Sequence, residues 1–190
     1  SYPSEDKTIK VDDNEFVYGG VMYNTKNTPS GYGAKEIIQF RKSGSTAGYI
    51  YNKAAISVIK KIAVYSQTNK DFTLTTGTTV KPTGNAVVSS SVTPTTAQIA
   101  CKDNNGADKT ATANVYTFDV ASSKPTFFMI TNGSNANYFF KIVITYGSAE
   151  GDEGDSGEGN IGIDDWKEDG ESGVGIEDWK DDEDSGDCDT

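Results

Sequence analysis

The stretch YFFKIVITY, residues 138–146, decides the fold class of this chain. Side chains of a β-strand alternate between its two faces, so every second residue points the same way. One of the two alternating sets in this stretch is entirely apolar or aromatic: Tyr138, Phe140, Ile142, Ile144 and Tyr146. The stretch therefore predicts a strand with one face in a hydrophobic core.

The rest of the chain up to residue 147 has the same character in shorter pieces. Its apolar runs are short and are bounded by Gly, Pro and Asn, which is the pattern of many short strands. We expect ten strands, over residues 15–23, 35–42, 48–51, 58–66, 72–76, 86–91, 98–102, 114–120, 126–131 and 138–146. The predicted fold is all-β, an antiparallel β-sandwich or jelly roll of about ten strands.

Charge and composition divide the chain near Gly147. Residues 1–149 hold 15 Lys and Arg against 10 Asp and Glu, whereas residues 150–190 hold two Lys against 18 acids. A segment of Gly, Asp, Glu and Ser cannot bury enough apolar surface to fold by itself. We predict a β-sandwich domain over residues 1–147 and an acidic low-complexity tail over residues 148–190.

The tail contains a tandem repeat of 13 residues. Residues 160–172 (NIGIDDWKEDGES) align with residues 173–185 (GVGIEDWKDDEDS), with seven identities, and each copy carries one of the two Trp residues of the chain. A large apolar ring has no role in a solvated linker, so we predict an anchor in a partner's apolar pocket, with the acids facing Lys or Arg. The predicted partner-binding residues are Ile163, Asp165, Trp166, Ile176, Asp178 and Trp179.

Three interpretations of the repeat stay open. It docks onto a protein partner, with two copies on one tether raising avidity. Alternatively, it folds back onto its own basic body or onto that of a neighbouring subunit, which the opposite charges favour. In the third interpretation it is a duplication without any partner.

Composition argues against catalysis. The chain has no His, on which most general bases, nucleophile-activating groups and zinc sites depend. It also lacks the phosphate-binding loops and nucleophile motifs that mark common enzyme classes. We expect no catalytic residues and no enzyme activity. The chain has no apolar run of about 18 residues, and its net charge is negative, so we expect neither a membrane span nor a nucleic-acid partner.

No cofactor is expected, with calcium as the one metal that the tail could take. Asp181, Glu183 and Ser185, followed by Gly186, match the first ligand positions of an EF-hand loop, although no Glu follows at the last position. Loose cation binding by an acidic polymer is the alternative. The two cysteines, Cys101 and Cys188, allow either one disulfide between body and tail or two free thiols.

Residues 35–146 resemble a family of small β-sandwich modules found on secreted or surface proteins of gut-type bacteria and their phages. The likeness lies in residues 38–42, 48–52, 59–62, 116–119, 127–133 and 141–146, which are strand motifs. The resemblance implies a jelly-roll-like fold and an extracellular, cell-surface or virion-surface setting, and it implies no catalytic residues.

Together these features predict a non-catalytic extracellular or virion-surface structural or assembly module. In this prediction the tail docks its Trp-acid repeats onto a protein partner or a neighbouring subunit. The alternative is a carbohydrate-binding, adhesin-like module, in which exposed Tyr rings stack on sugars with or without calcium. Aromatic residues in strands more often pack in the core than bind ligands.

Overall fold

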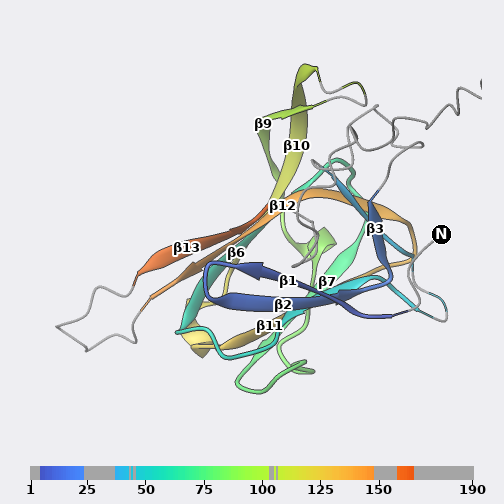
Figure 1. The fold of residues 1–190 in the computed structure, drawn as a ribbon. Coiled ribbons are helices and arrows are strands. Elements are labelled where there is room, and N and C mark those ends of the chain that lie inside the picture. The colour runs from blue at the N-terminus through green and yellow to red at the C-terminus, as the bar shows by residue number, and fades with distance from the viewer. Residues whose placement is uncertain are drawn as a thin grey trace, which may run out of the picture.

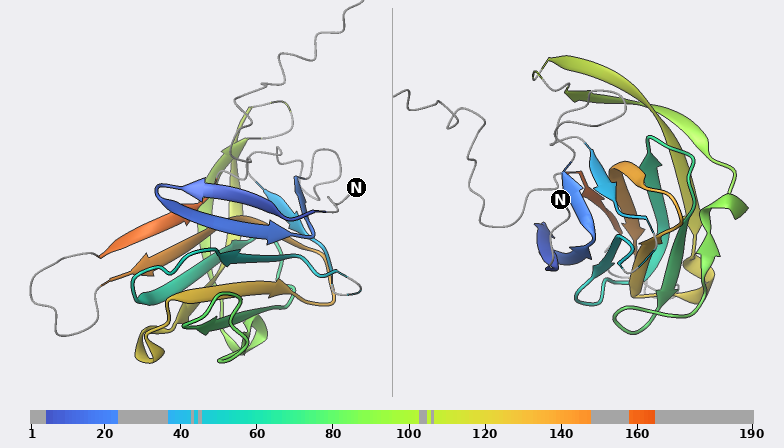
Figure 2. Two further views of the ribbon diagram at one scale, coloured as in Figure 1. Left: turned by 60° about the horizontal axis from the view of Figure 1, so that its bottom comes forward. Right: turned by 90° about the vertical axis from the view of Figure 1, so that its right-hand side faces the viewer.

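The computed structural model describes residues 5–23, 37–42, 44, 46–102, 105, 107–147 and 158–164. Within these residues it contains thirteen β-strands and two single-turn 3-10 helices, η1 (Ser89–Ser91) and η2 (Ala121–Ser123). The strands form two antiparallel sheets packed against each other, as Figure 1 and the views in Figure 2 show. The all-β sandwich predicted from the sequence is confirmed.

The first sheet has six strands. Its order is β1-β2-β5-β11-β7-β8, and every neighbouring pair is antiparallel. The strands are β1 (Lys7–Val11), β2 (Asn14–Gly19), β5 (Tyr49–Asn52), β11 (Phe127–Asn132), β7 (Phe72–Gly77) and β8 (Val87–Val88).

The second sheet has seven strands. Its order is β3-β4-β12-β6-β10-β9, and β13 also pairs with β12. The strands are β3 (Val21–Tyr23), β4 (Ile38–Phe40), β12 (Asn137–Tyr146), β6 (Ile59–Ser66), β10 (Asp108–Asp119), β9 (Thr95–Lys102) and β13 (Gly159–Ile163).

The chain visits the two sheets in the order of a jelly roll. From β4 through β5 and β6 to β7 it changes sheet at every step. From β8 it crosses to the hairpin of β9 and β10 in the other sheet, and it then changes sheet again to β11 and to β12. These eight strands divide equally, as β4-β12-β6-β10 in one sheet and β5-β11-β7-β8 in the other. This arrangement is the double Greek key of jelly rolls. The remaining strands extend or flank this framework.

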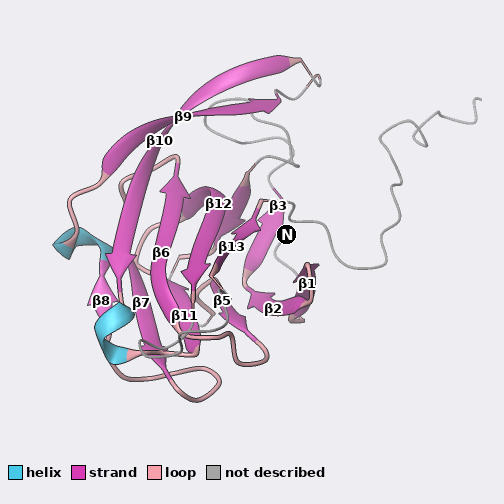
Figure 3. Cartoon of the chain, turned by 90° about the vertical axis from the view of Figure 1, so that its left-hand side faces the viewer, coloured by secondary structure: helices cyan, strands magenta, loops and turns pink. Residues whose placement is uncertain are grey.

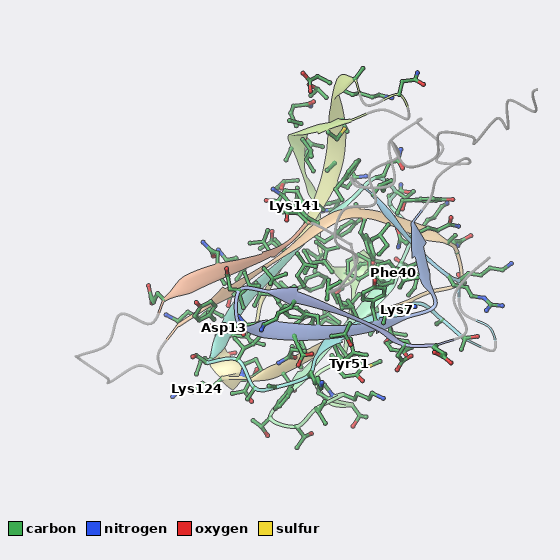
Figure 4. The ribbon with its side chains drawn as sticks, in the orientation of Figure 1. Lys7, Asp13, Phe40, Tyr51, Lys124 and Lys141 are labelled. Atoms are coloured by element: carbon green, nitrogen blue, oxygen red, sulfur yellow. The ribbon has the colours of Figure 1, made fainter. Side chains whose placement is uncertain are left out.

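Aromatic rings fill the space between the sheets. The ring centroid of Phe72, in the six-stranded sheet, lies 5.4 Å from that of Tyr116, 5.8 Å from that of Phe118 and 5.3 Å from that of Phe139. Phe40, labelled in Figure 4, lies 4.7 Å from Phe139. The three pairs of Phe72 are edge-to-face, an arrangement that aromatic rings prefer. The core therefore joins strands of both sheets through one aromatic cluster.

Strand β12 contains an irregularity that the alternating pattern does not predict. Its register against β6 shifts between Phe139 and Lys141. A bulge inserts one residue and interrupts the alternation of the strand. As a result, Phe139 packs in the main core with Ile142 and Ile144, while Phe140 packs in a second cluster. The single apolar face expected for residues 138–146 is therefore divided between two clusters.

Strand β1 was not expected from the sequence. Of its five residues only Ile9 is buried, so its apolar pattern is too short to identify a strand. A turn at Asp12 and Asp13 joins β1 to β2, and Asp12 adopts a left-handed conformation with φ of 52°. The segment becomes a strand because it pairs with β2, whereas its own apolar pattern does not determine its secondary structure.

Candidate functional site

The first repeat of the tail contributes a strand to the sandwich. Strand β13 pairs antiparallel with the C-terminal half of β12, with Ile163 opposite Ile142 and Ile161 opposite Ile144. Figure 1 shows β13 extending along β12 at one side of the molecule. Ile161 is 1% exposed and Ile163 is 0% exposed, and both belong to the main core. We call the edge of β12 over residues 142–146, together with Lys60, the β13 slot.

Two polar contacts hold the start of the strand in the β13 slot. Nζ of Lys60 lies 2.5 Å from Oε1 of Glu158, and Oγ1 of Thr145 donates a hydrogen bond of 2.8 Å to Oδ1 of Asn160. The hydrogen bond from Lys60, assisted by its positive charge, lowers the pKa of the Glu158 carboxyl below its ordinary value. An acidic residue just before the strand is therefore matched to a basic residue on the body.

The atoms around the strand restrict the size of the side chain at one position and leave room for a side chain at another. A Cβ atom at Gly159 would lie 2.6 Å from the hydroxyl of Tyr146, whereas a Cβ atom at Gly162 would meet no atom within 4 Å. Real Cβ atoms do not approach other atoms as closely as 2.6 Å, so a larger residue at position 159 requires the Tyr146 ring to move. The slot thus selects a small residue at position 159.

From composition and repetition alone, residues 159–163 were expected in the tail and Ile163 in a partner's pocket. The structure instead places these residues in the sandwich and Ile163 in its own core. In this part of the chain the tail folds back on its own body. The available signal was the alternation Ile161-Gly162-Ile163, which gives a short strand one apolar face. It was missed because the average composition of the tail is dominated by Gly and acids.

The other residues predicted to bind lie outside the described part of the chain. They are Asp165, Trp166, Ile176, Asp178 and Trp179 for the partner, and Asp181, Glu183 and Ser185 for the metal. Within the described residues, no group of three or more His, Cys, Asp or Glu is placed to hold a metal ion. Cys101 is buried, and Cys188 is also outside the described residues.

The β9–β10 hairpin forms an arm that the sequence predicted only in part. Strand β10 pairs with β6 over residues 114–119, whereas residues 108–113 pair with β9. Figure 3 shows this part of the hairpin arching over the other strands. Residues 98–102 of β9 were expected as a strand. Residues 108–113 of β10 were missed because Thr alternates there with Ala rather than with larger apolar residues.

The two faces of the arm differ in character. One face carries Ala111, Ala113 and Cys101, which are buried in the second cluster with Ile37 and Phe140. The other face is exposed and polar, and Nε2 of Gln98 donates a hydrogen bond of 3.0 Å to Oγ1 of Thr112 across it. The arm therefore rests on the outer face of the seven-stranded sheet through small apolar residues.

A tyrosine pair lies on the outer face of the six-stranded sheet. The rings of Tyr49 and Tyr51 have centroids 6.1 Å apart and planes 21° apart. Nζ of Lys81 lies 5.0 Å from the centroid of Tyr51, a residue that is only 8% exposed and is labelled in Figure 4. The Tyr49 hydroxyl donates to the carboxylate of Asp6. Burial, followed by this hydrogen bond, raises the pKa of Tyr49 well above its ordinary value.

The described surface offers few apolar platforms on which a sugar ring could stack. Its exposed large apolar side chains are Val80 and Val88, and neither is aromatic. Most aromatic rings of the described strands are buried, Tyr18, Phe128, Phe139 and Phe140 among them. Packing is therefore the role of most aromatic residues in the described strands.

The buried polar side chains of the described residues are amides and hydroxyls that bind the main chain. Nδ2 of Asn132 donates to the carbonyl oxygens of Phe40, at 3.1 Å, and Asn135, at 2.8 Å. Nδ2 of Asn137 donates to the carbonyl oxygen of Lys70 at 2.9 Å. Such groups satisfy buried main-chain atoms and fix the loops to the sheets.

None of the helices in the described residues is long and apolar enough to cross a membrane. Comparisons of the chain with protein-family models, with curated proteins and with solved structures found no match.

Proposed function

We propose that this chain is a non-catalytic structural or assembly module of an extracellular or virion surface, whose tail docks its Trp-acid repeats onto a neighbouring subunit. The observation that carries the proposal is β13. A piece of the repeat lies along a sheet edge with its Ile side chains buried and its preceding acid paired with Lys60. A repeat that pairs with a sheet edge of its own chain is suited to pair with a sheet edge of a neighbouring subunit.

The chemistry of the described residues supports a role without catalysis. Their buried polar side chains are neutral, namely Asn52, Ser66, Thr76, Ser89, Asn132 and Asn137. Asp12, Asp13, Asp71 and Asp119 are all exposed to solvent. A general acid or base acts from a site that holds the substrate against it, and these carboxylates point into solvent.

Charge supports docking between subunits. The body carries an excess of Lys and Arg, and the tail carries a large excess of Asp and Glu. The contact between Lys60 and Glu158 is one pairing of body with tail, and the exposed side chains of Lys61 and Lys124 offer further cationic positions. Complementary charge speeds association and sets its orientation, and it makes association sensitive to salt.

Light scattering on the full chain tests the proposal. We expect dimers or larger assemblies that dissociate when the ionic strength rises, and we expect the double substitution Trp166→Ala and Trp179→Ala to yield monomers. Val80→Ala is the matched control, because it removes apolar surface from an exposed loop of the body. The proposal fails if the unaltered chain is monomeric up to its solubility limit, or if the Trp variant assembles equally well.

The alternative is a carbohydrate-binding module that uses the outer face of the six-stranded sheet. The observation that favours it is the near-parallel pair of Tyr49 and Tyr51 on that face. A glycan array, with and without calcium, separates the two candidates. Saturable sugar binding that is lost on Tyr49→Ala would favour the alternative, whereas a structural module binds no sugar in this way.

A further inference from the structure

The second repeat contains a close copy of the segment that fills the β13 slot. We call residues 158–163 (EGNIGI) the first segment and residues 171–176 (ESGVGI) the second segment. Aligned on the 13-residue period, Glu171 matches Glu158, Val174 matches Ile161 and Ile176 matches Ile163. These are the acid that pairs with Lys60 and the two apolar side chains that enter the core.

The contacts of the first segment define what the slot requires. Its occupant must form a strand that pairs with residues 142–146. The occupant must also carry two apolar side chains separated by one residue, and an acid three residues before the first of them. The residue between the apolar pair faces open space, so the slot sets no limit on its size. The second segment meets each of these requirements. Backbone pairing and alternate side-chain pockets are the usual basis on which a sheet edge recognises a strand.

We propose that the β13 slot is a binding site for either segment, and that residues 171–176 of the same chain occupy it in alternation with residues 158–163. When the second segment enters, the first segment leaves. Ile163 then becomes available to a partner, and the part of the chain that follows the slot becomes shorter by one repeat. The slot thus sets which of the two repeats is presented.

Three differences make the second segment the weaker occupant. Val174 is one methylene smaller than Ile161, Gly173 lacks the amide with which Asn160 accepts from Thr145, and Ser172 places a Cβ where Gly159 has none. The chain that joins the slot to the second segment is also longer, over residues 148–170 instead of 148–157. Loop closure alone then disfavours it about threefold. With the lost methylene and hydrogen bond, occupancy falls on the order of a hundredfold.

Hydrogen–deuterium exchange on the full chain tests the proposal without unfolding the protein. The triple substitution Ser172→Gly, Gly173→Asn and Val174→Ile makes the second segment identical to the first, so only the threefold loop term separates them. We expect protection of residues 158–163 to fall to less than about tenfold, because the second segment then occupies the slot in a substantial fraction of molecules. Exchange of residues 171–176 should slow at the same time, by about a quarter, because the second segment is in the slot about a quarter of the time.

The matched control carries Ser172→Gly and Gly173→Asn with Val174→Asp, which puts a charge where the slot buries an apolar side chain. It should leave protection of residues 158–163 as in the unaltered chain. The proposal is overturned if the triple variant also leaves that protection unchanged and residues 171–176 exchange freely. Light scattering of the triple variant, made together with Trp166→Ala and Trp179→Ala so that Trp-dependent assembly is absent, should give a monomer. A dimer that forms together with the protection of residues 171–176 would overturn occupancy within one chain in favour of exchange between two chains.

Thermal unfolding gives a second readout. Replacing Ile161 and Ile163 by Asp removes the first segment from the slot, and replacing Val174 and Ile176 by Asp removes the second. We expect the second pair to change nothing alone but to lower the melting temperature further when added to the first pair. Equal melting temperatures for the first pair and for all four substitutions would overturn the proposal. These measurements follow Ile residues and stability, so they are independent of the Trp-dependent assembly tested above.

Discussion

Ile163→Ala, made in a chain that ends at residue 170, tests whether β13 is part of the core. That chain retains β13 and lacks the second repeat, so no other segment can replace the altered strand. Ile163 is 0% exposed and packs with the main core. Truncating such a residue removes three carbon atoms and leaves a cavity. We expect the free energy of unfolding to fall by about 2–5 kcal/mol for Ala and by about 0.5–1.5 kcal/mol for Ile163→Val.

Urea denaturation followed by circular dichroism measures both variants. With a denaturant dependence of about 1–3 kcal/mol per molar urea, the Ala substitution should lower the midpoint by roughly 1–2 M. Val88→Ala is the control, because Val88 is 42% exposed in the six-stranded sheet and should cost less than about 1 kcal/mol.

The comparison of the two substitutions gives a second check. The loss in the free energy of unfolding cannot exceed the free energy with which β13 is docked, because an altered β13 can leave the slot while the rest of the sandwich stays folded. Equal small losses for Val and Ala would therefore mean weak docking. A loss below about 1 kcal/mol for Ala, in a chain whose β13 amides exchange slowly enough to show stable docking, would refute the placement of Ile163 in the core.

Three further predictions concern the slot and the loops. Glu158→Gln should speed amide exchange in β13 at neutral pH and have no effect in strong acid. The contact with Lys60 lowers the pKa of Glu158 in the folded state, so it stabilises β13 fully above the ordinary carboxyl pKa. This stabilisation is lost as the pH falls through the lowered, folded-state pKa. Gly133→Ala should cost about 1–3 kcal/mol, since its Cβ would lie 2.5 Å from a main-chain oxygen, whereas Gly84→Ala, with open space around it, should be neutral by urea denaturation. Asn137→Ala should lower the unfolding free energy by about 1–3 kcal/mol, because it leaves a buried carbonyl without its donor, and a loss near zero would show that water replaces the amide.

Several elements could be predicted from the sequence because their pattern is local. Residues 72–76 alternate apolar with polar side chains and form most of β7, and residues 58–66, which are rich in Val and Ile, form β6. Boundaries near turn residues were also close, as for residues 126–131 and β11. Alternation of period two reports which residues share a face, and it needs no knowledge of the partner strand.

Other elements could not be predicted because their pattern is weak or depends on a partner. The bulge at Phe139 exists only relative to β6, so the division of the aromatic residues between two clusters is a property of the pair. Residues 108–113, the part of the arm that β10 supplies, are too poor in large apolar residues to stand out from a loop. Strand β13 has only two apolar residues, and it becomes a strand where β12 offers an unpaired edge.

By itself, the sequence determined that this chain is an all-β body with an excess of positive charge, followed by an acidic tail in which one short element occurs twice. Composition, alternation and repetition are properties of the chain alone. The tertiary structure decided where the body ends. Ile161 and Ile163 are buried only because β12, once packed between its neighbours, leaves an edge with which their strand can pair. It also showed that one copy of the repeated element lies in the core, since only the packed sheets create the slot that receives it.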